Sequence, residues 1–242
     1  MPWVDHDRRA GAGGPSWILG DGEVHLWVVA PDAVTGGDEL LETLSREERD
    51  RAARFHRERD RQRYIAAHGA VRALLGRYVG AEPADLTFVA GVRGKPRLAE
   101  GGPRFNLSHA GGWVVIGVAA DQEIGVDVEI GSRGDAWLDV AAAALSPAER
   151  SWLAGLPEAD RERACYRLWT AKEAVAKATG EGLALPPAEI VVGPLDAAGP
   201  SGAEVVVRGR RWWLRSFELA PDIVAALASE CRPAAVRLLR WP

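Results

Sequence analysis

SREER at residues 45–49 decides the fold, because the chain repeats it as SPAER at residues 146–150. Each stretch has the Ser-x-x-Glu spacing of a capping box, in which a serine and a glutamate satisfy backbone amides at the start of a helix. A longer helix is predicted after each stretch, over about residues 60–79 and 160–179. The same order of short and long helix in both places indicates an internal repeat.

Glycines and strands extend the repeat. Gly76 and Gly180 stand near the ends of the two long helices, where we expect them to act as C-terminal caps. Runs rich in β-branched and aromatic residues predict strands between and after the helices. These runs cover residues 23–30, 86–90, 104–107, 113–119, 123–129, 189–192, 203–208, 212–217, 223–228 and 235–239.

This pattern predicts an α+β protein of two similar halves, related by a pseudo-twofold axis and separated by a cleft. We expect residues 23–130 to form the N-terminal half and residues 131–242 the C-terminal half. Residues 1–22 are rich in Gly, Pro and mixed charge, which is typical of a flexible N-terminal tail. Because one chain already supplies two similar halves, we expect a monomer rather than a dimer.

Composition restricts the class of protein. The 242 residues are 47% hydrophobic and 26% charged, which is typical of a globular protein and excludes general disorder. Cys165 and Cys231 form neither a disulfide framework nor a C-x-x-C motif, and every apolar run is far shorter than the ~20 residues of a membrane span. The N-terminus also lacks the apolar core of a signal peptide, so we predict a cytoplasmic protein with no membrane partner.

Positive charge comes almost entirely from arginine, since 27 of the 30 basic residues are Arg. An encoding bias that replaces surface lysine by arginine explains this ratio without any function. The three lysines, Lys95, Lys172 and Lys177, should then stand where a compact ammonium cannot be exchanged for a planar guanidinium.

Two carboxylates share one face of a predicted strand. Asp127 and Glu129 alternate with apolar residues in GVDVE, residues 125–129, so both point to the same side, roughly 7 Å apart. Such a pair is either a solvated strand face or a place where a cation binds between the two side chains. Hard oxygen ligands of this kind suit Mg²⁺ or Mn²⁺.

A second group of charges lies on the second long helix. In WTAKEAVAK, residues 169–177, the side chains of Trp169, Glu173 and Lys177 follow one another at i, i+4 and i+8 and therefore form one stripe. By themselves, Glu173 and Lys177 would be an ordinary surface ion pair of about 0.2–0.5 kcal/mol.

Two shorter motifs lie within the predicted N-terminal half. FNLSH, residues 105–109, places His109 just past the end of a predicted strand. GKP, residues 94–96, combines a glycine that lets the backbone approach a flat ligand with a proline that stiffens the turn. Each motif by itself is weak, because a single histidine is more often structural than functional.

In this order and spacing, the motifs together resemble 4′-phosphopantetheinyl transferases of the surfactin-synthetase type. The matching motifs are GKP at 94–96, FNLSHAGGW at 105–113, IGVDVE at 124–129 and LWTAKEAVAK at 168–177. The resemblance extends over about residues 23–240. The fold that it implies, a monomer of two similar α+β halves, agrees with the repeat found from the capping boxes.

The resemblance implies a reaction and a metal. The phosphopantetheine arm of coenzyme A would be transferred to a serine of an apo acyl or peptidyl carrier protein, releasing adenosine 3′,5′-bisphosphate, as in polyketide or nonribosomal peptide biosynthesis. Mg²⁺, or alternatively Mn²⁺, would be held on the pyrophosphate by Asp127, Glu129 and Glu173, and Glu173 would also be the base toward the serine hydroxyl. A divalent cation and an ammonium would neutralise charge on the attacked phosphoryl group.

The resemblance also implies contacts with coenzyme A. Lys177 and His109 would act at the phosphates. The residues that would border the adenine are Gly94, Lys95, Pro96 and Ser108.

The 3′-phosphate site departs from the family pattern. Our candidates are Arg51, Arg54 and Arg63, which match basic positions of that pattern. Glu48, however, stands where a family lysine often sits, and Tyr64 stands where a small hydroxyl residue often sits. Either change is expected to alter the affinity for coenzyme A. The alternative is that this segment is a solvated helix face with mixed ion pairs.

Two other functions would use some of the same residues. An Arg-rich nucleic-acid-binding module would use residues 46–63, but the formal net charge is -4 and the signs alternate there, so we expect no nucleic-acid partner. A Mg²⁺-dependent phosphohydrolase would use the same carboxylates. Neither function explains why all three lysines lie in the transferase motifs.

A carrier protein is expected to dock beside residues 131–145. Trp137, Leu138, Val140 and Leu145 have spacings compatible with one apolar helical face. The segment follows directly on the acidic strand, so a docked serine could reach the phosphorus. The alternative is that these side chains belong to the core.

Overall fold

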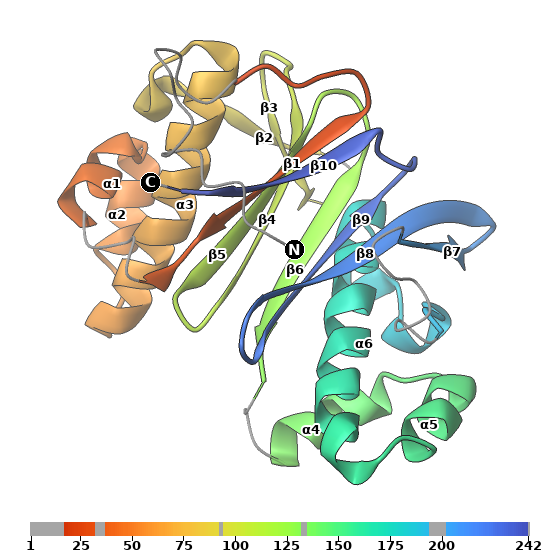
Figure 1. The fold of residues 1–242 in the computed structure, drawn as a ribbon. Coiled ribbons are helices and arrows are strands. Elements are labelled where there is room, and N and C mark those ends of the chain that lie inside the picture. The colour runs from red at the N-terminus through yellow and green to blue at the C-terminus, as the bar shows by residue number, and fades with distance from the viewer. Residues whose placement is uncertain (1–16, 32–36, 92–93, 132–134, 194–201, 242) are drawn as a thin grey trace. The chain divides into compact units, whose positions relative to one another are not determined.

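The computed structural model describes residues 17–31, 37–91, 94–131, 135–193 and 202–241. The chain divides into two compact units (Figure 1). Unit 1 comprises Met1–Gly91, Pro96–Asp121 and Ala234–Pro242, and unit 2 comprises Val92–Lys95 and Gln122–Pro233. Both units combine helices with a sheet, which confirms the predicted α+β class. Within the described residues, no helix is long and apolar enough to span a membrane.

Unit 1 packs a long helix against a four-stranded sheet. Its helices are α1 (Gly37–Thr43), α2 (Arg46–Ala52), α3 (Glu58–Val79) and the 3₁₀ turn η3 (Pro83–Asp85). Its strands are β1 (Glu23–Val29), β2 (Phe88–Ala90), β3 (Pro96–Leu98), β4 (Arg104–Ala110), β5 (Trp113–Ala119) and β10 (Ala235–Arg240). The sheet order is β10-β1-β5-β4, with β10 parallel to β1, and β2 and β3 form a separate antiparallel pair.

Unit 2 has the same kind of construction. Its helices are α4 (Asp135–Ala143), α5 (Pro147–Ala154), α6 (Glu158–Thr179) and the 3₁₀ turns η5 (Gly182–Ala184) and η6 (Pro187–Glu189). Its strands are β6 (Ile124–Ile130), β7 (Ala203–Val207), β8 (Arg210–Ala220) and β9 (Ile223–Ser229), in the antiparallel order β6-β9-β8-β7.

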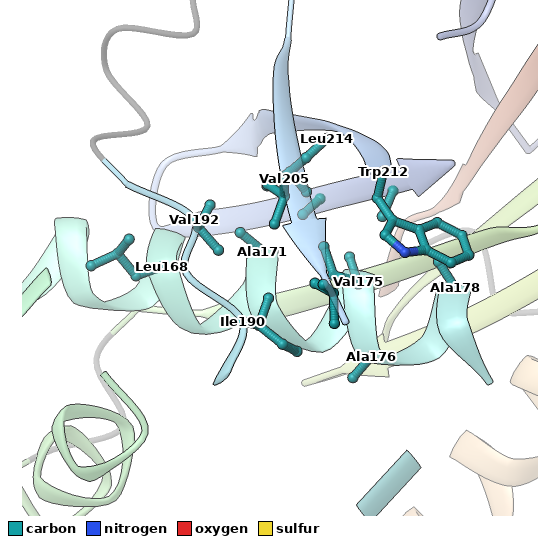
Figure 2. Packing of buried hydrophobic residues seen from close by; sticks show 14 of the residues in the cluster. Leu168, Ala171, Val175, Ala176, Ala178, Ile190, Val192, Val205, Trp212 and Leu214 are labelled. Carbon is teal, nitrogen blue, oxygen red and sulfur yellow. The ribbon is translucent and has the colours of Figure 1, made fainter. Parts of the chain in front are cut away.

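Apolar side chains of α6 form the core of unit 2 with one face of this sheet. Figure 2 shows Leu168, Ala171 and Val175 of the helix close to Val205 and Leu214 of the strands. Buried apolar area is the main stabilising contribution to such a layer, at about 25 cal/mol per Å². The helix therefore packs on this face of the sheet.

The two capping boxes form as the sequence predicted. Ser45 and Glu48 cap α2, and Ser146 and Glu149 cap α5, each with both reciprocal hydrogen bonds. The following helices, α3 and α6, each contain 22 residues and each end at a glycine with a φ of 69°.

Each capping glutamate also binds a buried cation of the long helix that follows. Arg72 of α3 donates to Glu48 and to the carbonyl oxygens of Pro83 and Leu86. Because the contact recurs in unit 2, where Lys172 of α6 replaces the arginine, the internal repeat includes buried charges that the spacing of helices and strands did not predict.

The predicted C-terminal cap of the first long helix was wrong. The cap is Gly80, whose left-handed φ suits a residue without a side chain. Gly76 lies inside the helix and is buried, and a Cβ added there would come within 2.7 Å of the carbonyl oxygen of Ala81. Gly76 is thus needed where the chain folds back over the helix.

Two predicted segments also differ in the structure. Residues 189–192 form no strand: η6 ends at Glu189, Ile190 is buried in the core, and the amide of Val192 donates to Glu149. The backbones of Ile190 and Val192 bind Lys172 and Glu149 instead of pairing in a sheet, and Val191 is exposed. In the predicted tail, Trp17 stacks on Trp27 with ring centroids 5.1 Å apart, and residues 1–16 lie outside the described residues.

The division into units also differs from a boundary after residue 130. Strand β6 pairs with β9, so the main segment of unit 2 begins at Gln122. Strand β10 pairs with β1, so the last residues return to unit 1 at Ala234. Long-range strand pairing decides both positions.

Candidate active site

The acidic strand lies directly on the long helix of unit 2. A Cβ added to Gly125 of β6 would come within 2.1 Å of the Ala174 carbonyl oxygen and 2.3 Å of the Ala178 amide nitrogen, both in α6. Since strand side chains alternate, Asp127 and Glu129 point to the same side as Gly125 and therefore toward α6. The glycine is required here because only a residue without a side chain permits this approach.

Lys177 of α6 forms an ion pair with Asp127 of β6. Its ammonium nitrogen Nζ donates to Asp127 Oδ1 at 2.7 Å. The Asp127 side chain is 8% exposed and the Lys177 side chain 29% exposed, so solvent screens this pair only in part. The structure thus joins two of the motifs that are 50 residues apart in the chain.

Glu173 stands one helical turn before Lys177. Burial raises the pKa of its carboxyl, the negative charge of Asp127 raises it further, and the positive charge of Lys177 lowers it. Two carboxylates and one ammonium therefore interact between β6 and α6. The predicted stripe on the helix and the predicted face of the strand meet within unit 2.

These side chains have the donor chemistry of a site for a hard divalent cation. Asp127, Glu129 and Glu173 supply carboxylate oxygens, the ligands that Mg²⁺ and Mn²⁺ prefer. A cation there would offset the repulsion between Asp127 and Glu173. In the part of the chain that the structure describes, however, no three metal-ligating side chains converge on one point as the side chains stand.

Unit 1 contains a pocket of about 360 Å³ beside the C-terminal end of β4. Arg63 and His109, both predicted from the sequence, line it. His109 lies inside β4, where it pairs with Val114, and not past the end of a strand. The other lining residues are Pro31, Arg59, Gln62, Ala66, Gly111, Gly112, Trp113 and Val114.

The pocket includes residues that the sequence reasoning missed. Arg59 and Gln62 reach it from α3, the helix that also carries Arg63. The spacing of 59, 62, 63 and 66 is that of one helical face, which could have identified Arg59 and Gln62 once Arg63 was chosen. Trp113 comes from the start of β5 and is part of the FNLSHAGGW motif.

The other two arginine candidates do not line this pocket. Arg51 lies over the ring of Tyr64, with its guanidinium carbon 5.5 Å from the ring centroid, and Arg54 is exposed at the end of α2. Tyr64 also packs against Phe55 and His68. A role of Arg51 and Arg54 in binding the 3′-phosphate stays a prediction.

Glu48, which stands where a family lysine often sits, makes contacts that stabilise the fold. Burial would raise its pKa, but hydrogen bonds from His68, the Ser45 amide and Arg72 outweigh burial and lower the pKa to about 2. Glu48 is therefore an anion that holds α2 against α3.

The GKP motif spans the division between the units. Gly94 has a φ of 85° and, with Lys95, belongs to unit 2, whereas Pro96 begins β3 of unit 1 and pairs with Ala90. The Lys95 ammonium donates to the Glu123 carboxylate and to two carbonyl oxygens. Ser108 is buried within β4.

Of the three lysines, Lys172 is buried in the interior of unit 2, where it forms an ion pair that stabilises the fold. Its side chain is fully buried, and its ammonium lies 2.7 Å from Glu149 and donates to the carbonyl oxygens of Pro187 and Ile190. A lysine in this arginine-rich chain therefore does not by itself mark a site of chemistry.

The segment expected to receive a carrier protein lies partly in the core. Leu145 is fully buried, and Leu138 packs against the core of unit 2. Val140 is 59% exposed, and the side chain of Trp137 lies outside the described residues. The apolar face predicted for docking is therefore divided between core and surface.

Comparisons with known proteins agree with the motifs. Residues 123–228 match a family model described as the 4′-phosphopantetheinyl transferase superfamily, and residues 37–122 match one described as 4′-phosphopantetheinyl transferase, N-terminal. The chain is 36% identical over 222 residues to 4′-phosphopantetheinyl transferase HetI of Nostoc sp., covering 88% of this chain and 90% of the relative. It is 29% identical over 162 residues to 4′-phosphopantetheinyl transferase Sfp of Bacillus subtilis, covering 66% of this chain and 71% of the relative.

Proposed function

The chain belongs to the 4′-phosphopantetheinyl transferase superfamily, and on that premise we propose that it moves the phosphopantetheine arm of coenzyme A onto a serine of an apo carrier protein. The observation that carries this proposal is the meeting of β6 and α6, where Lys177 pairs with Asp127 next to Glu173. An acidic site with one ammonium suits transfer of a phosphoryl group, because its charges can orient and neutralise a pyrophosphate.

The reaction we propose is a substitution at phosphorus. The serine Oγ forms a bond to the phosphorus that bears the pantetheine arm, and the bond from that phosphorus to the bridging oxygen breaks. The leaving group is adenosine 3′,5′-bisphosphate, and the serine proton passes to a base. Glu173 is our candidate base, and Lys177 our candidate for stabilising negative charge on the pyrophosphate.

We place the divalent cation at Asp127, Glu129 and Glu173, whose oxygens suit Mg²⁺. When bound, it would neutralise charge on the pyrophosphate and its leaving oxygen. Asp127 has a second role, since its carboxylate also holds the Lys177 ammonium.

We propose that the pocket of unit 1 binds phosphate groups of coenzyme A. Arg63 and His109 supply two nitrogen-bearing side chains, and Arg59 and Gln62 add two further donors. A guanidinium is suited to phosphate because its planar fork donates two parallel hydrogen bonds. Gly94, Pro96 and Ser108 stay candidates for the adenine.

The decisive experiment offers apo acyl and peptidyl carrier domains to the protein with coenzyme A and Mg²⁺. Mass spectrometry should show the carrier gain the arm, and the serine-to-alanine carrier should stay unchanged. A phosphohydrolase would instead consume coenzyme A without modifying any carrier. A panel of carriers from polyketide, peptide and fatty-acid synthesis would identify the partner, and size-exclusion chromatography would test the predicted monomer.

Two variants test the residues. Asp127→Ala should abolish transfer while the circular dichroism spectrum stays that of the folded protein. Full turnover of the wild-type protein in excess chelator would refute the proposal that transfer needs a divalent cation. Arg63→Ala should raise the KM for coenzyme A and leave the KM for the carrier unchanged.

A further inference from the structure

The ammonium of Lys95 contacts three acceptors within unit 2. It lies 2.7 Å from Glu123 Oε2, 2.8 Å from the carbonyl oxygen of Ile124 and 3.4 Å from the carbonyl oxygen of Ala178. The side chain is 9% exposed. An ammonium has three donor hydrogens, so it can donate to these three acceptors at the same time.

The three acceptors belong to the two elements of the acidic site. Ile124 is the first residue of β6, the strand that carries Asp127. Ala178 lies in the last turn of α6, next to Lys177. One ammonium therefore connects the start of the strand to the end of the helix.

The contact with Ala178 also suits the end of a helix. The last four carbonyl oxygens of a helix have no partner within it, and a positive charge is favourable near them. Lys95 supplies both a donor and a charge at this place.

Close packing makes this connection important for the site. At Gly125 the strand lies against the α6 backbone with no room for a methyl group. Any shift of β6 along α6 would therefore move Asp127 relative to Lys177, whose charged atoms are now 2.7 Å apart. A misplacement of about 1 Å in such a site can lower a rate about 100-fold.

We propose that Lys95 is a positioning residue that holds β6 and α6 in register and thereby places Asp127 and Lys177 for the transfer reaction. This inference rests on the proposed function only for its effect on the rate. It differs from a role in which the Lys95 side chain binds the adenine. Lys95 makes these contacts from a single nitrogen atom, whereas an arginine would distribute its donors over a planar guanidinium and could not keep all three in the same geometry.

The test compares Lys95→Met with Arg72→Met. Arg72 is a matched control, because it too is a buried cation bound to a glutamate and to carbonyl oxygens, but in unit 1. For Lys95→Met, kcat should fall about 10- to 100-fold, while the dissociation constant of coenzyme A from the free enzyme changes less than about twofold. Lys95→Arg should recover only part of the loss, and Arg72→Met should keep its kcat.

Two results would overturn the proposal. A weakened affinity for coenzyme A with unchanged kcat would mean that the ammonium contacts the substrate. An equal loss of kcat in Arg72→Met would mean that any buried cation has this effect. If Lys95→Met does not fold, Glu123→Gln weakens the contact between the ammonium and this carboxylate and should lower kcat in the same direction by a smaller factor.

A structural measurement separates this inference from the proposed function. In a crystal structure of Lys95→Met, the distance between Lys177 Nζ and Asp127 Oδ1 should exceed the 2.7 Å of the wild-type protein. An unchanged distance refutes positioning, even if the enzyme works as proposed. Failure of the wild-type protein to modify any carrier refutes the proposed function and leaves this distance to decide the role of Lys95.

Discussion

In unit 1 a buried arginine meets Glu48, and in unit 2 a buried lysine meets Glu149, at the same place relative to the capping box and the long helix. The depths differ. The side chains of Glu149 and Lys172 are 1% and 0% exposed, whereas Glu48 is 18% exposed and also lies near His68. Both cations donate to carbonyl oxygens beside a 3₁₀ turn that follows the helix.

Comparing the two units separates the residues that stabilise the fold from those that form the candidate active site. The two long helices have equal length and equivalent caps, but Glu173 of α6 corresponds in position to Ala73 of α3. The repeated contacts therefore maintain both units, and the residues that differ give unit 2 its acidic site. A charge that recurs in both units is better explained by stability than by catalysis.

Glu173→Ala gives α6 the residue that α3 has at this position, and it should show the largest effect. Loss of a general base lowers a rate by about 100- to 10,000-fold, which is the expected fall in kcat. The free energy of unfolding should stay the same or rise, because the variant removes a carboxylate that lies close to Asp127. Transfer assays and urea unfolding measure the two effects, and an active variant would contradict the role of Glu173.

Lys172→Met breaks the deeper of the two ion pairs. It leaves Glu149 buried without its cation, which typically costs about 3–5 kcal/mol of unfolding free energy. Glu149→Gln combined with Lys172→Met removes the uncompensated charge but keeps an oxygen for the amide of Val192, so it should recover part of the loss. Chemical denaturation measures both, and a loss below about 1 kcal/mol would show that the pair is dispensable.

Arg72→Met breaks the shallower pair and should cost less, about 2 kcal/mol, which is the usual value for hydrogen bonds to charged groups. The cost is smaller because Glu48 is partly exposed and lies near His68, so its charge stays better solvated than that of Glu149. The same unfolding experiment measures it. A cost larger than that of Lys172→Met would reverse the order of the two clusters.

The lowered pKa of Glu48 should make the free energy of unfolding depend on pH in acid. The folded-state pKa of about 2 lies below the ordinary value of 4.5, so Glu48 stabilises the fold above about pH 4.5. This contribution is lost progressively as the pH falls from 4.5 toward 2. Glu48→Gln, which has no charge to lose, should show a smaller decrease of unfolding free energy over this range, and equal pH dependence in the two proteins would contradict the assignment.

Much of the site could be predicted because its signals are local. Alternation along β6 placed Asp127 and Glu129 on one face, and helical spacing placed Glu173 and Lys177 on one stripe. The resemblance to 4′-phosphopantetheinyl transferases then predicted that the strand and the helix contribute to one site. The contact of Lys95 with Ala178 has no such signal, because it brings together atoms 83 residues apart through the fold of the whole unit.

Local chemistry in the sequence determined the two capping boxes, both long helices and the acidic strand, because each depends on side chains within a few residues of one another. Tertiary structure alone decided that β10 pairs with β1, that Gly76 lies under a returning chain and that Lys172 is buried with Glu149. Strand pairing and the burial of charge depend on which distant segments meet. The same lysine can be a surface charge or the centre of a buried cluster, and only the packing around it decides which.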